Sequence, residues 1–453
     1  MSARVVIESK FIAEWLEGIP ATLDDPHSSQ FDHHRSKKRK YHHHPLSPPT
    51  SLSGSRSISD DMAPSLKTPS KKHKKRKVDT AHDDSDPEGN EEETPTQPPR
   101  AMDIDNSDVL SLSSASMSQA SNKSSPTKLF PQLSLAPQGL KRVPMDLKDP
   151  NLPTDLVYLM IEMQAICRGR GVVPRSLKST IEERKRESRA DYIFYSEFDD
   201  VVYGTDDGFS TEMDTLLNTA LKTVDAAVDC DATQQDETGW NHLVHSPLLD
   251  TVLDRIPRNL VGFAPCMTAN ITSRYKIPSA PGARVDYAMF ANPLKDGDSR
   301  LDDAIENLQR RMPEASINHT PFTPFSKRPI SVSIETKRQN GEGDKAVLQI
   351  GIWQAAQWNL LSELTESRIE DLSFIPGIVV EGHEWKLVAT THRAGKTVLW
   401  TSQLFGNTLS PLGSFQAMAG VRRLRRWTAE TYWPWYKRHV LKLGPREAPR
   451  LPV

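Results

Sequence analysis

Apolar and polar residues alternate along residues 330–337, and this spacing predicts a β-strand. Successive side chains of a strand point to opposite faces of its sheet. Val332 and Ile334 therefore share one face with Thr336, whereas Glu335 and Lys337 lie on the other. An acid and an amine thus emerge together from a strand whose other face is apolar.

In other segments the apolar residues recur every three or four positions, which predicts helices. Trp240, Val244, Leu248 and Val252 follow this spacing and predict the buried face of one helix. The predicted helices cover residues 152–168, 210–228, 240–253, 300–311, 345–364 and 415–430. Further strands are predicted at residues 284–290, 378–380, 385–390 and 396–401, with a loop at 406–413. We expect a folded domain over residues 145–440 and a tail at 441–453.

The first 140 residues differ from the rest in composition. Residues 1–20 predict a short amphipathic helix, which either docks on the main domain or binds a partner. Residues 21–140 are rich in Ser, Pro, His, Lys and Asp, and have too little apolar surface to offset the entropy of ordering the chain. They predict a disordered low-complexity region with basic and acidic runs.

A basic run in this region is followed by an acidic run at residues 83–93. Such a basic run suits a nuclear-import receptor or a phosphate backbone, or is merely a solvated charge run. We expect an import receptor as a partner and the nucleus as the location. The basic side chains are Lys71, Lys72, Lys74, Lys75, Arg76 and Lys77.

Composition excludes several classes of protein. The chain has no run of about 18 apolar residues, so no membrane span is expected. Residues 1–20 lack the apolar core of a secretory signal. The 3 cysteines are widely spaced and odd in number, which favours neither a disulfide framework nor a zinc site and indicates a reducing compartment inside the cell.

The candidate chemistry lies on two predicted strands. Asp286 belongs to the strand at residues 284–290, and Glu335 and Lys337 belong to the strand at 330–337. Two carboxylates on neighbouring strands can hold a hard cation, Mg²⁺ or Mn²⁺, through oxygen, and the cation can orient a water or stabilise charge on a phosphate. The alternative is a solvent-facing ion pair on a surface strand.

Longer segments around these residues resemble the fungal PD-(D/E)XK nuclease-like domain proteins. They are the segment 328–338 around Glu335, 346–358 (AVLQIGIWQAAQW), 237–249 (ETGWNHLVHSPLL), 382–388 (GHEWKLV) and 432–436 (YWPWY). The resemblance implies an α/β, restriction-endonuclease-like core, with a central mixed sheet flanked by helices. Such families include inactive members, so it does not by itself imply cleavage.

The resemblance also implies roles for individual residues. Asp286 corresponds to the family's first acidic strand position, and Glu335 and Lys337 correspond to its Glu-X-Lys. Asp286 and Glu335 are then metal ligands, and Lys337 positions the attacking water. Glu237 is the candidate for a third, helical carboxylate, although Leu243 stands where family members often carry an acid.

Other polar residues are candidates for contacts to water or nucleic acid. Gln349 lies on the helix face that is expected to point toward the sheet, where it can hydrogen-bond a water or a phosphate. The alternative is a surface or capping glutamine. Arg284, Arg422 and Arg425 are candidate phosphate contacts, and the aromatic residues near the last two could instead close the core while the arginines stay solvated.

The sequence thus predicts a nuclear, metal-dependent nuclease that hydrolyses phosphodiester bonds of nucleic acid, with DNA expected from the superfamily. One alternative is a catalytically degenerate module that keeps the nuclease fold and binds nucleic acid or a protein partner. Another is an interaction scaffold that acts through its N-terminal region.

Overall fold

The structure is a computed structural model, and it describes residues 125–206, 213–253, 258–339, 343–365 and 369–444. The amphipathic helix predicted for residues 1–20 lies outside the described residues. So do residues 21–124 of the predicted low-complexity region, including the basic run from Lys71 to Lys77. Within the described residues, no helix combines the length and the apolar character needed to cross a membrane.

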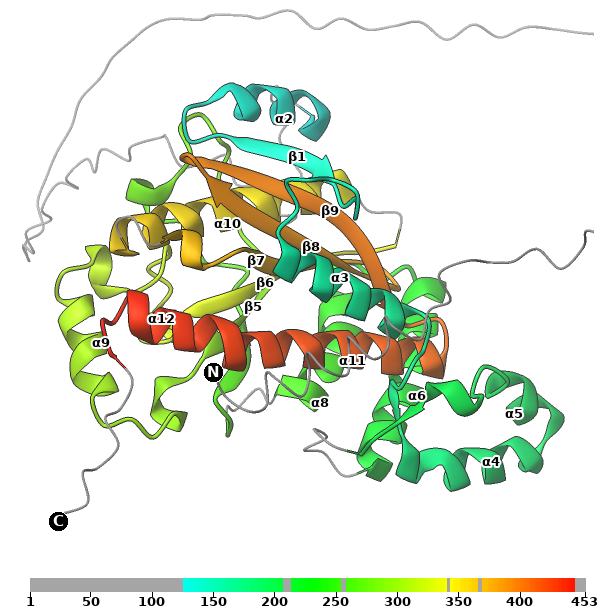
Figure 1. The fold of residues 1–453 in the computed structure, drawn as a ribbon. Coiled ribbons are helices and arrows are strands. Elements are labelled where there is room, and N and C mark those ends of the chain that lie inside the picture. Colours follow the sequence, from blue (N-terminus) through cyan, green and yellow to red (C-terminus); the bar gives the residue numbers. More distant parts are fainter. Residues whose placement is uncertain (1–124, 207–212, 254–257, 340–342, 366–368, 445–453) are drawn as a thin grey trace, which may run out of the picture. The chain divides into compact units, whose positions relative to one another are not determined.

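A mixed sheet of seven strands lies at the centre of the fold (Figure 1). Its strand order is β1-β9-β8-β7-β6-β5-β4. The β1/β9 and β6/β7 pairs are parallel, and the other pairs are antiparallel. The strands are β1 (Leu140–Pro144), β4 (Val261–Pro265), β5 (Tyr287–Ala291), β6 (Ile330–Lys337), β7 (Ile375–Glu381), β8 (Glu384–Arg393) and β9 (Lys396–Asn407). The predicted α/β class with a mixed sheet is confirmed.

Helices cover both faces of this sheet (Figure 1). The long helix α10 (Gly343–Thr365) packs against β6 and β7, while α11 (Pro411–Trp427) and α3 (Thr154–Cys167) pack against β9. The remaining α-helices are α2 (Pro126–Leu135), α4 (Lys178–Glu187), α5 (Arg189–Phe194), α6 (Met213–Ala232), α7 (Glu237–Trp240), α8 (Ser246–Leu253), α9 (Leu301–Gln309) and α12 (Trp433–His439). A small two-stranded sheet, β2 (Val173–Pro174) with β3 (Tyr203–Gly204), accompanies α4 and α5.

Helix α10 is buried on nearly all sides, so its polar residues need partners inside the protein. The amide of Gln354 donates to the carbonyl of Pro376 at 2.9 Å, and the amide of Gln357 donates to the carbonyl of Ile330 at 2.8 Å. These bonds tie α10 to β7 and β6. The helix is therefore a fixed element beside the strand that carries the Glu-X-Lys motif.

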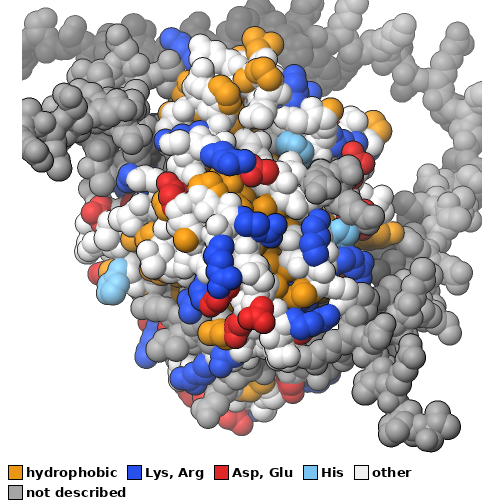
Figure 2. All heavy atoms as spheres, turned by 90° about the vertical axis from the view of Figure 1, so that its left-hand side faces the viewer, with side chains coloured by type: hydrophobic (Ala, Val, Ile, Leu, Met, Phe, Trp, Pro, Cys, Tyr) orange, Lys and Arg blue, Asp and Glu red, His pale blue; other side chains and the backbone are white. Residues whose placement is uncertain are grey.

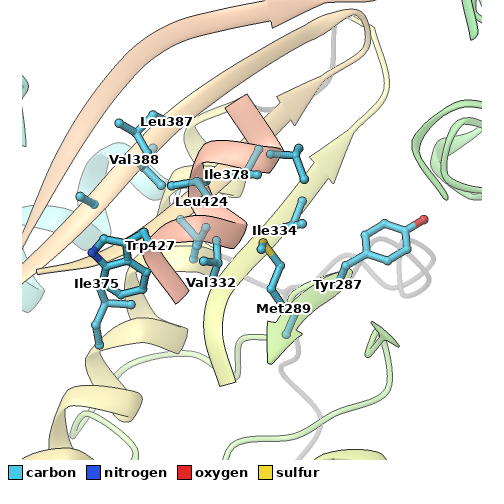
Figure 3. Close-up of a cluster of buried hydrophobic side chains, with 14 of the residues drawn as sticks. Tyr287, Met289, Val332, Ile334, Ile375, Ile378, Leu387, Val388, Leu424 and Trp427 are labelled. Carbon is cyan, nitrogen blue, oxygen red and sulfur yellow. The ribbon is translucent and has the colours of Figure 1, made fainter. Parts of the chain in front are cut away.

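The alternation predicted an apolar face for β6, and in the structure this face packs against α11. Figure 3 shows Val332 and Ile334 in one buried cluster with Leu424 and Trp427 of α11. The opposite face of β6 looks toward α10, because Ser333 pairs with Gly377, whose α-carbon lies against α10. Glu335 and Lys337 follow Ser333 on that face. The sheet thus directs both motif side chains into the layer between β6 and α10.

Two boundaries of the fold differ from the prediction. The disordered region was expected to reach residue 140, but α2 lies within its last part and β1 begins at its last residue. Phe130 and Leu133 of α2 are buried, and β1 pairs with β9, which is distant in the sequence. A pairing of this kind is invisible to local composition, which averages over the polar residues around it. At the other end, Leu441 is buried although it was assigned to the tail.

Candidate active site

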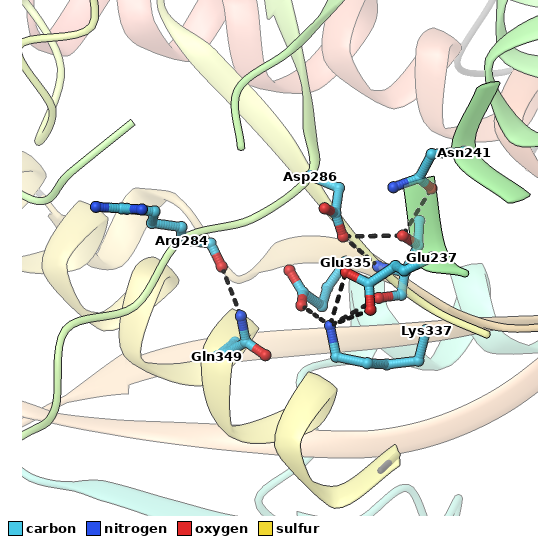
Figure 4. Close-up of polar contacts among 8 residues, drawn as sticks. Glu237, Asn241, Arg284, Asp286, Glu335, Lys337 and Gln349 are labelled. Carbon is cyan, nitrogen blue, oxygen red and sulfur yellow. Dashed lines mark hydrogen bonds and ion pairs between the residues drawn. The ribbon is translucent and has the colours of Figure 1, made fainter. Parts of the chain in front are cut away.

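Strand β6 brings an amine against two carboxylates (Figure 4). The Nζ atom of Lys337 lies 2.6 Å from Glu335 Oε1 and 3.2 Å from Glu237 Oε2. It also donates to the carbonyl of Thr336 at 2.8 Å. Glu335 is only 1 % exposed, so this is a buried ion pair. The surface ion pair considered as an alternative is therefore excluded for this motif.

Asp286 lies beside the motif because β5 and β6 are antiparallel neighbours. Tyr287 pairs with Ile334, which places Asp286, one residue earlier, alongside Glu335. Its Oδ2 atom accepts hydrogen bonds from the backbone N–H of Thr336 at 2.8 Å and from the Thr336 hydroxyl at 2.9 Å. The predicted proximity of the two strand carboxylates is thus found in the structure.

Glu237 reaches the same place from a helix. It is the first residue of α7, which begins where Asp236 caps the helix by accepting from the N–H of Gly239 at 2.8 Å. Its carboxylate contacts Lys337, so the helical acid does join the strand residues. Two carboxylates, Glu335 and Glu237, therefore contact the ammonium of Lys337, and Asp286 lies alongside Glu335.

Gln349 completes the group from α10, which faces Glu335 and Lys337. Its Nε2 atom donates to the carbonyl of Arg284 at 3.2 Å. Among the described residues, neither Gln349 Oε1 nor Glu335 Oε2, both buried, has a hydrogen-bond partner. Figure 4 shows both residues beside Lys337. Two unsatisfied buried acceptors are costly unless a donor or a cation meets them.

The donor atoms of this group suit a hard divalent cation. They are carboxylate and amide oxygens, which Mg²⁺ and Mn²⁺ prefer, and two of them lack a partner. No set of three or more His, Cys, Asp or Glu side chains in the described ranges is arranged to enclose a metal by itself. A cation here would therefore complete its shell with water and a phosphate oxygen, as Mg²⁺ commonly does.

Burial and like charge make these carboxylates hard to ionise. Burial raises the pKa of Asp286 to about 6, with Lys337 lowering it and Glu237 raising it further. Burial and the neighbouring Asp286 raise the pKa of Glu335 well above its usual range, and Lys337 opposes them. For Lys337 burial acts to lower the pKa, but the three carboxylates outweigh it and the pKa is raised. A further positive charge at this point would relieve the repulsion among the acids.

Replacement of Asp286 by asparagine is expected to raise the free energy of unfolding at pH 7. The folded-state pKa of about 6 lies above that of the unfolded chain, about 4, so the folded protein binds the proton more tightly. That contribution to stability is complete below about pH 4 and is lost as the pH rises through 6. The loss amounts to about 3 kcal/mol, from about two pKa units. Asparagine retains an oxygen that accepts from Thr336 and has no proton to lose.

Urea unfolding between pH 4 and 7 in the presence of a chelator measures this difference. The wild type should lose stability relative to Asp286→Asn across that range. Asp303→Asn, on the exposed side of α9, serves as the control and should follow the wild type. If the free energy of unfolding changed with pH in the same way for the wild type and Asp286→Asn, the assignment of a raised pKa to the buried Asp286 carboxyl would be contradicted.

The three arginines that were predicted to contact phosphate lie against other groups of the protein. The Nε atom of Arg284 donates to Asn270 Oδ1 at 2.8 Å, and Figure 4 shows its guanidinium directed away from the carboxylates. Arg425 donates to the carbonyl of Val252 at 3.3 Å and so joins α11 to α8. Burial lowers the pKa of Arg422 to about 10, with help from Arg426 and Arg425. Arg422 is therefore not solvated in the way the packing alternative assumed, and the phosphate contacts of Arg422 and Arg425 stay a prediction.

Two further residues of the site were not predicted. Thr336 was assigned to the apolar face, and it does point away from Glu335, yet its N–H and hydroxyl both hold Asp286. Asn241 is buried and contacts the Thr336 hydroxyl at 2.7 Å. Its position four residues after Glu237, on the same helix face, was the available signal.

Comparison with known proteins decides the family. The model of the PD-(D/E)XK nuclease superfamily matches residues 182–433, which is more than half of the chain. The chain belongs to the PD-(D/E)XK nuclease superfamily. No curated protein and no solved structure matches it.

Membership in the PD-(D/E)XK nuclease superfamily explains the arrangement of the site. The matched residues include Glu237, Asp286, Gln349 and the segment Glu335-Thr336-Lys337. The superfamily suggests nuclease-type activity and nucleic-acid binding, and its nucleases generally use divalent metals. Helices α2 and α3 and strand β1 precede the matched residues.

Proposed function

We propose that this protein is a Mg²⁺- or Mn²⁺-dependent nuclease that hydrolyses phosphodiester bonds of DNA. The observation that supports it most is a pair of buried oxygens, Glu335 Oε2 and Gln349 Oε1, that have no partner among the described residues and lie near Asp286 and Lys337. A structural ion pair alone would give no reason to leave these acceptors unsatisfied. Asp286 and Glu335 would hold the cation, with Glu237 as a third carboxylate.

The bound cation would supply Lewis-acid chemistry, by neutralising charge on the phosphate and making a water more acidic. The chain's own residues supply the remaining functions. Lys337 carries a full positive charge beside Glu335, where it can orient the attacking water and stabilise the negative charge that develops on the phosphate. The free oxygen of Gln349 can accept a hydrogen bond from that water.

Binding of the nucleic-acid backbone would rely on scattered basic side chains. Figure 2 shows Lys and Arg side chains spread over one face of the molecule, with acidic side chains between them. The chain as a whole has a formal net charge of −2. Contacts of this kind weaken steeply with salt, so cleavage is expected to be inhibited by increasing ionic strength. We further propose a nuclear location, with the basic run from Lys71 to Lys77 as the import signal.

The alternative function, a module that binds without cleaving, has one observation in its favour. The ammonium of Lys337 lies within 3.2 Å of both Glu335 and Glu237, so it already neutralises part of the acidic group. A protein that had lost its cation could keep its fold by means of this contact. The two functions differ in whether a divalent cation produces strand breaks.

Incubation of the full chain with supercoiled plasmid DNA separates them. We expect nicked and linear plasmid with Mg²⁺ or Mn²⁺, and intact plasmid when a chelator is present. A structured RNA of similar length, tested in parallel, should be cut more slowly. Retarded but intact plasmid in both metals would support the binding module instead.

A further inference from the structure

Asn241 contacts three of the elements that form the site, α7, β5 and β6. It is buried and begins the π turn Asn241–His245, directly after α7. Its backbone N–H donates to the carbonyl of Glu237, one turn earlier, so both side chains lie on the same face of the helix. The residue that follows Glu237 by one turn is thus also directed toward the strands.

The side chain of Asn241 is connected to Asp286 through Thr336. The Thr336 hydroxyl lies 2.7 Å from Asn241 Oδ1 and 2.9 Å from Asp286 Oδ2. A hydroxyl has one proton to donate, and Asn241 Nδ2 is a buried donor without a partner in the part of the chain that the structure describes. If Asn241 Nδ2 donates to the Thr336 hydroxyl oxygen, the hydroxyl can donate its own proton to Asp286. In that arrangement Asn241 determines that Thr336 donates to Asp286.

The backbone of Asn241 holds the other strand. Its carbonyl accepts from the Tyr287 hydroxyl at 3.0 Å, and the same hydroxyl lies 2.8 Å from Ser246 Oγ. Tyr287 directly follows Asp286 and begins β5. Wider turns of this type inside helices are frequent at functional sites. A single residue therefore contacts the middle of the Glu-X-Lys motif and the neighbour of the strand acid.

We propose that Asn241 is a positioning residue, which acts with Thr336 to fix the Asp286 carboxylate relative to Glu335 and Lys337. The inference rests on the proposed function, because a fixed orientation matters when Asp286 and Glu335 hold a cation together. Partners that hold a ligating side chain commonly contribute about 10- to 100-fold to metal affinity or activity. An asparagine that only fills the core would not act through Thr336.

A double-mutant cycle on the full chain tests this. Asn241→Leu and Thr336→Val remove the two polar groups and keep similar side-chain volumes. We expect each to weaken Mn²⁺ binding, measured by calorimetry, by about tenfold or more, and to lower kcat more than it changes KM. The double variant should be no worse than the worse single variant, because both changes break the same chain of hydrogen bonds. Thr336→Ser, which keeps the hydroxyl, should bind Mn²⁺ like the wild type.

Asn307→Leu, on the exposed side of α9, is the matched control and should leave Mn²⁺ binding unchanged. Unchanged Mn²⁺ binding in a folded Asn241→Leu variant would overturn the inference, as would losses that multiply in the double variant. If Asn241→Leu does not fold, equal binding by Thr336→Val and Thr336→Ser overturns it, and a loss confined to Thr336→Val supports it. If the wild type binds Mn²⁺ but cleaves nothing, the proposed nuclease activity is refuted. The Mn²⁺ affinities of the variants then still decide the role of Asn241. A wild type that binds no Mn²⁺ overturns both.

Discussion

Replacement of Glu335 by glutamine is expected to abolish cleavage while the fold remains intact. Glutamine has nearly the same shape and can still accept a hydrogen bond from Lys337, but it lacks the charge needed to hold a divalent cation. Loss of such electrostatic stabilisation costs about 10²- to 10³-fold in kcat. The free energy of unfolding should stay the same or rise, because one of three mutually repelling carboxylates is removed. Plasmid nicking and urea unfolding of the same preparation measure both effects.

The chain contains its own control for this change. Glu384, Trp385 and Lys386 form a second Glu-X-Lys on β8, in which Lys386 Nζ lies 2.7 Å from Glu384 Oε2. The side chain of Glu384 is 51 % exposed, whereas that of Glu335 is 2 % exposed. Glu384→Gln should therefore leave the nicking rate unchanged. Equal losses of nicking rate in Glu335→Gln and Glu384→Gln would contradict the assignment of the active site to the buried Glu335.

Replacement of Lys337 by methionine is expected to impair both activity and stability. Within the described residues Lys337 supplies the only ammonium in contact with Glu335, and Glu335 is too deeply buried for water to replace it. Removal of one partner of a buried ion pair typically costs about 3 to 5 kcal/mol. The loss should become smaller as the pH is lowered, because Glu335, whose pKa is raised by burial and by Asp286, takes up a proton and no longer needs a buried counter-charge. Cleavage should fall by about 100-fold or more, since Lys337 also stabilises the transition state.

Urea unfolding at pH 5 and 7 tests the stability part, with Lys386→Met as the comparison. Lys386 also contacts two glutamates, but these are partly exposed and water can solvate them. Lys386→Met should therefore lower the free energy of unfolding much less than Lys337→Met, and this loss should depend less on pH. A similar loss in the two lysine variants, or a Lys337→Met loss that does not change with pH, would contradict the account of the buried group.

The strand that carries the motif was predictable because its signal is local. Alternation along residues 330–337 placed Glu335 and Lys337 on one face, and the structure confirms this together with the packing of Val332 and Ile334 against α11. The closeness of Asp286 followed from two neighbouring strands. Helix α11 begins at Pro411, within the predicted loop, because Ser410 caps it by accepting from the N–H of Gly413. Such boundaries depend on single capping contacts.

The remaining parts of the site depend on contacts between distant segments. No local pattern states that Glu237 reaches Lys337 across 100 positions of the chain, or that Asn241 meets Thr336. Thr336 was missed for a physical reason: alternation describes where a side chain points, but Asp286 is held partly by the backbone N–H of Thr336. The phosphate contacts of Arg422 and Arg425 stay a prediction, because basic residues beside aromatics look the same in sequence whether they pack or bind.

Calorimetric titration of Mn²⁺ into the full chain, wild type against Glu335→Gln, shows whether the buried acidic group around Lys337 is a divalent-cation site. We expect saturable binding to the wild type and, for the glutamine variant, a loss of affinity at least as large as the roughly tenfold that removal of an outer-shell partner of a metal ligand costs. Binding that is equal in both folded proteins, or absent from the wild type, would contradict the assignment of this site.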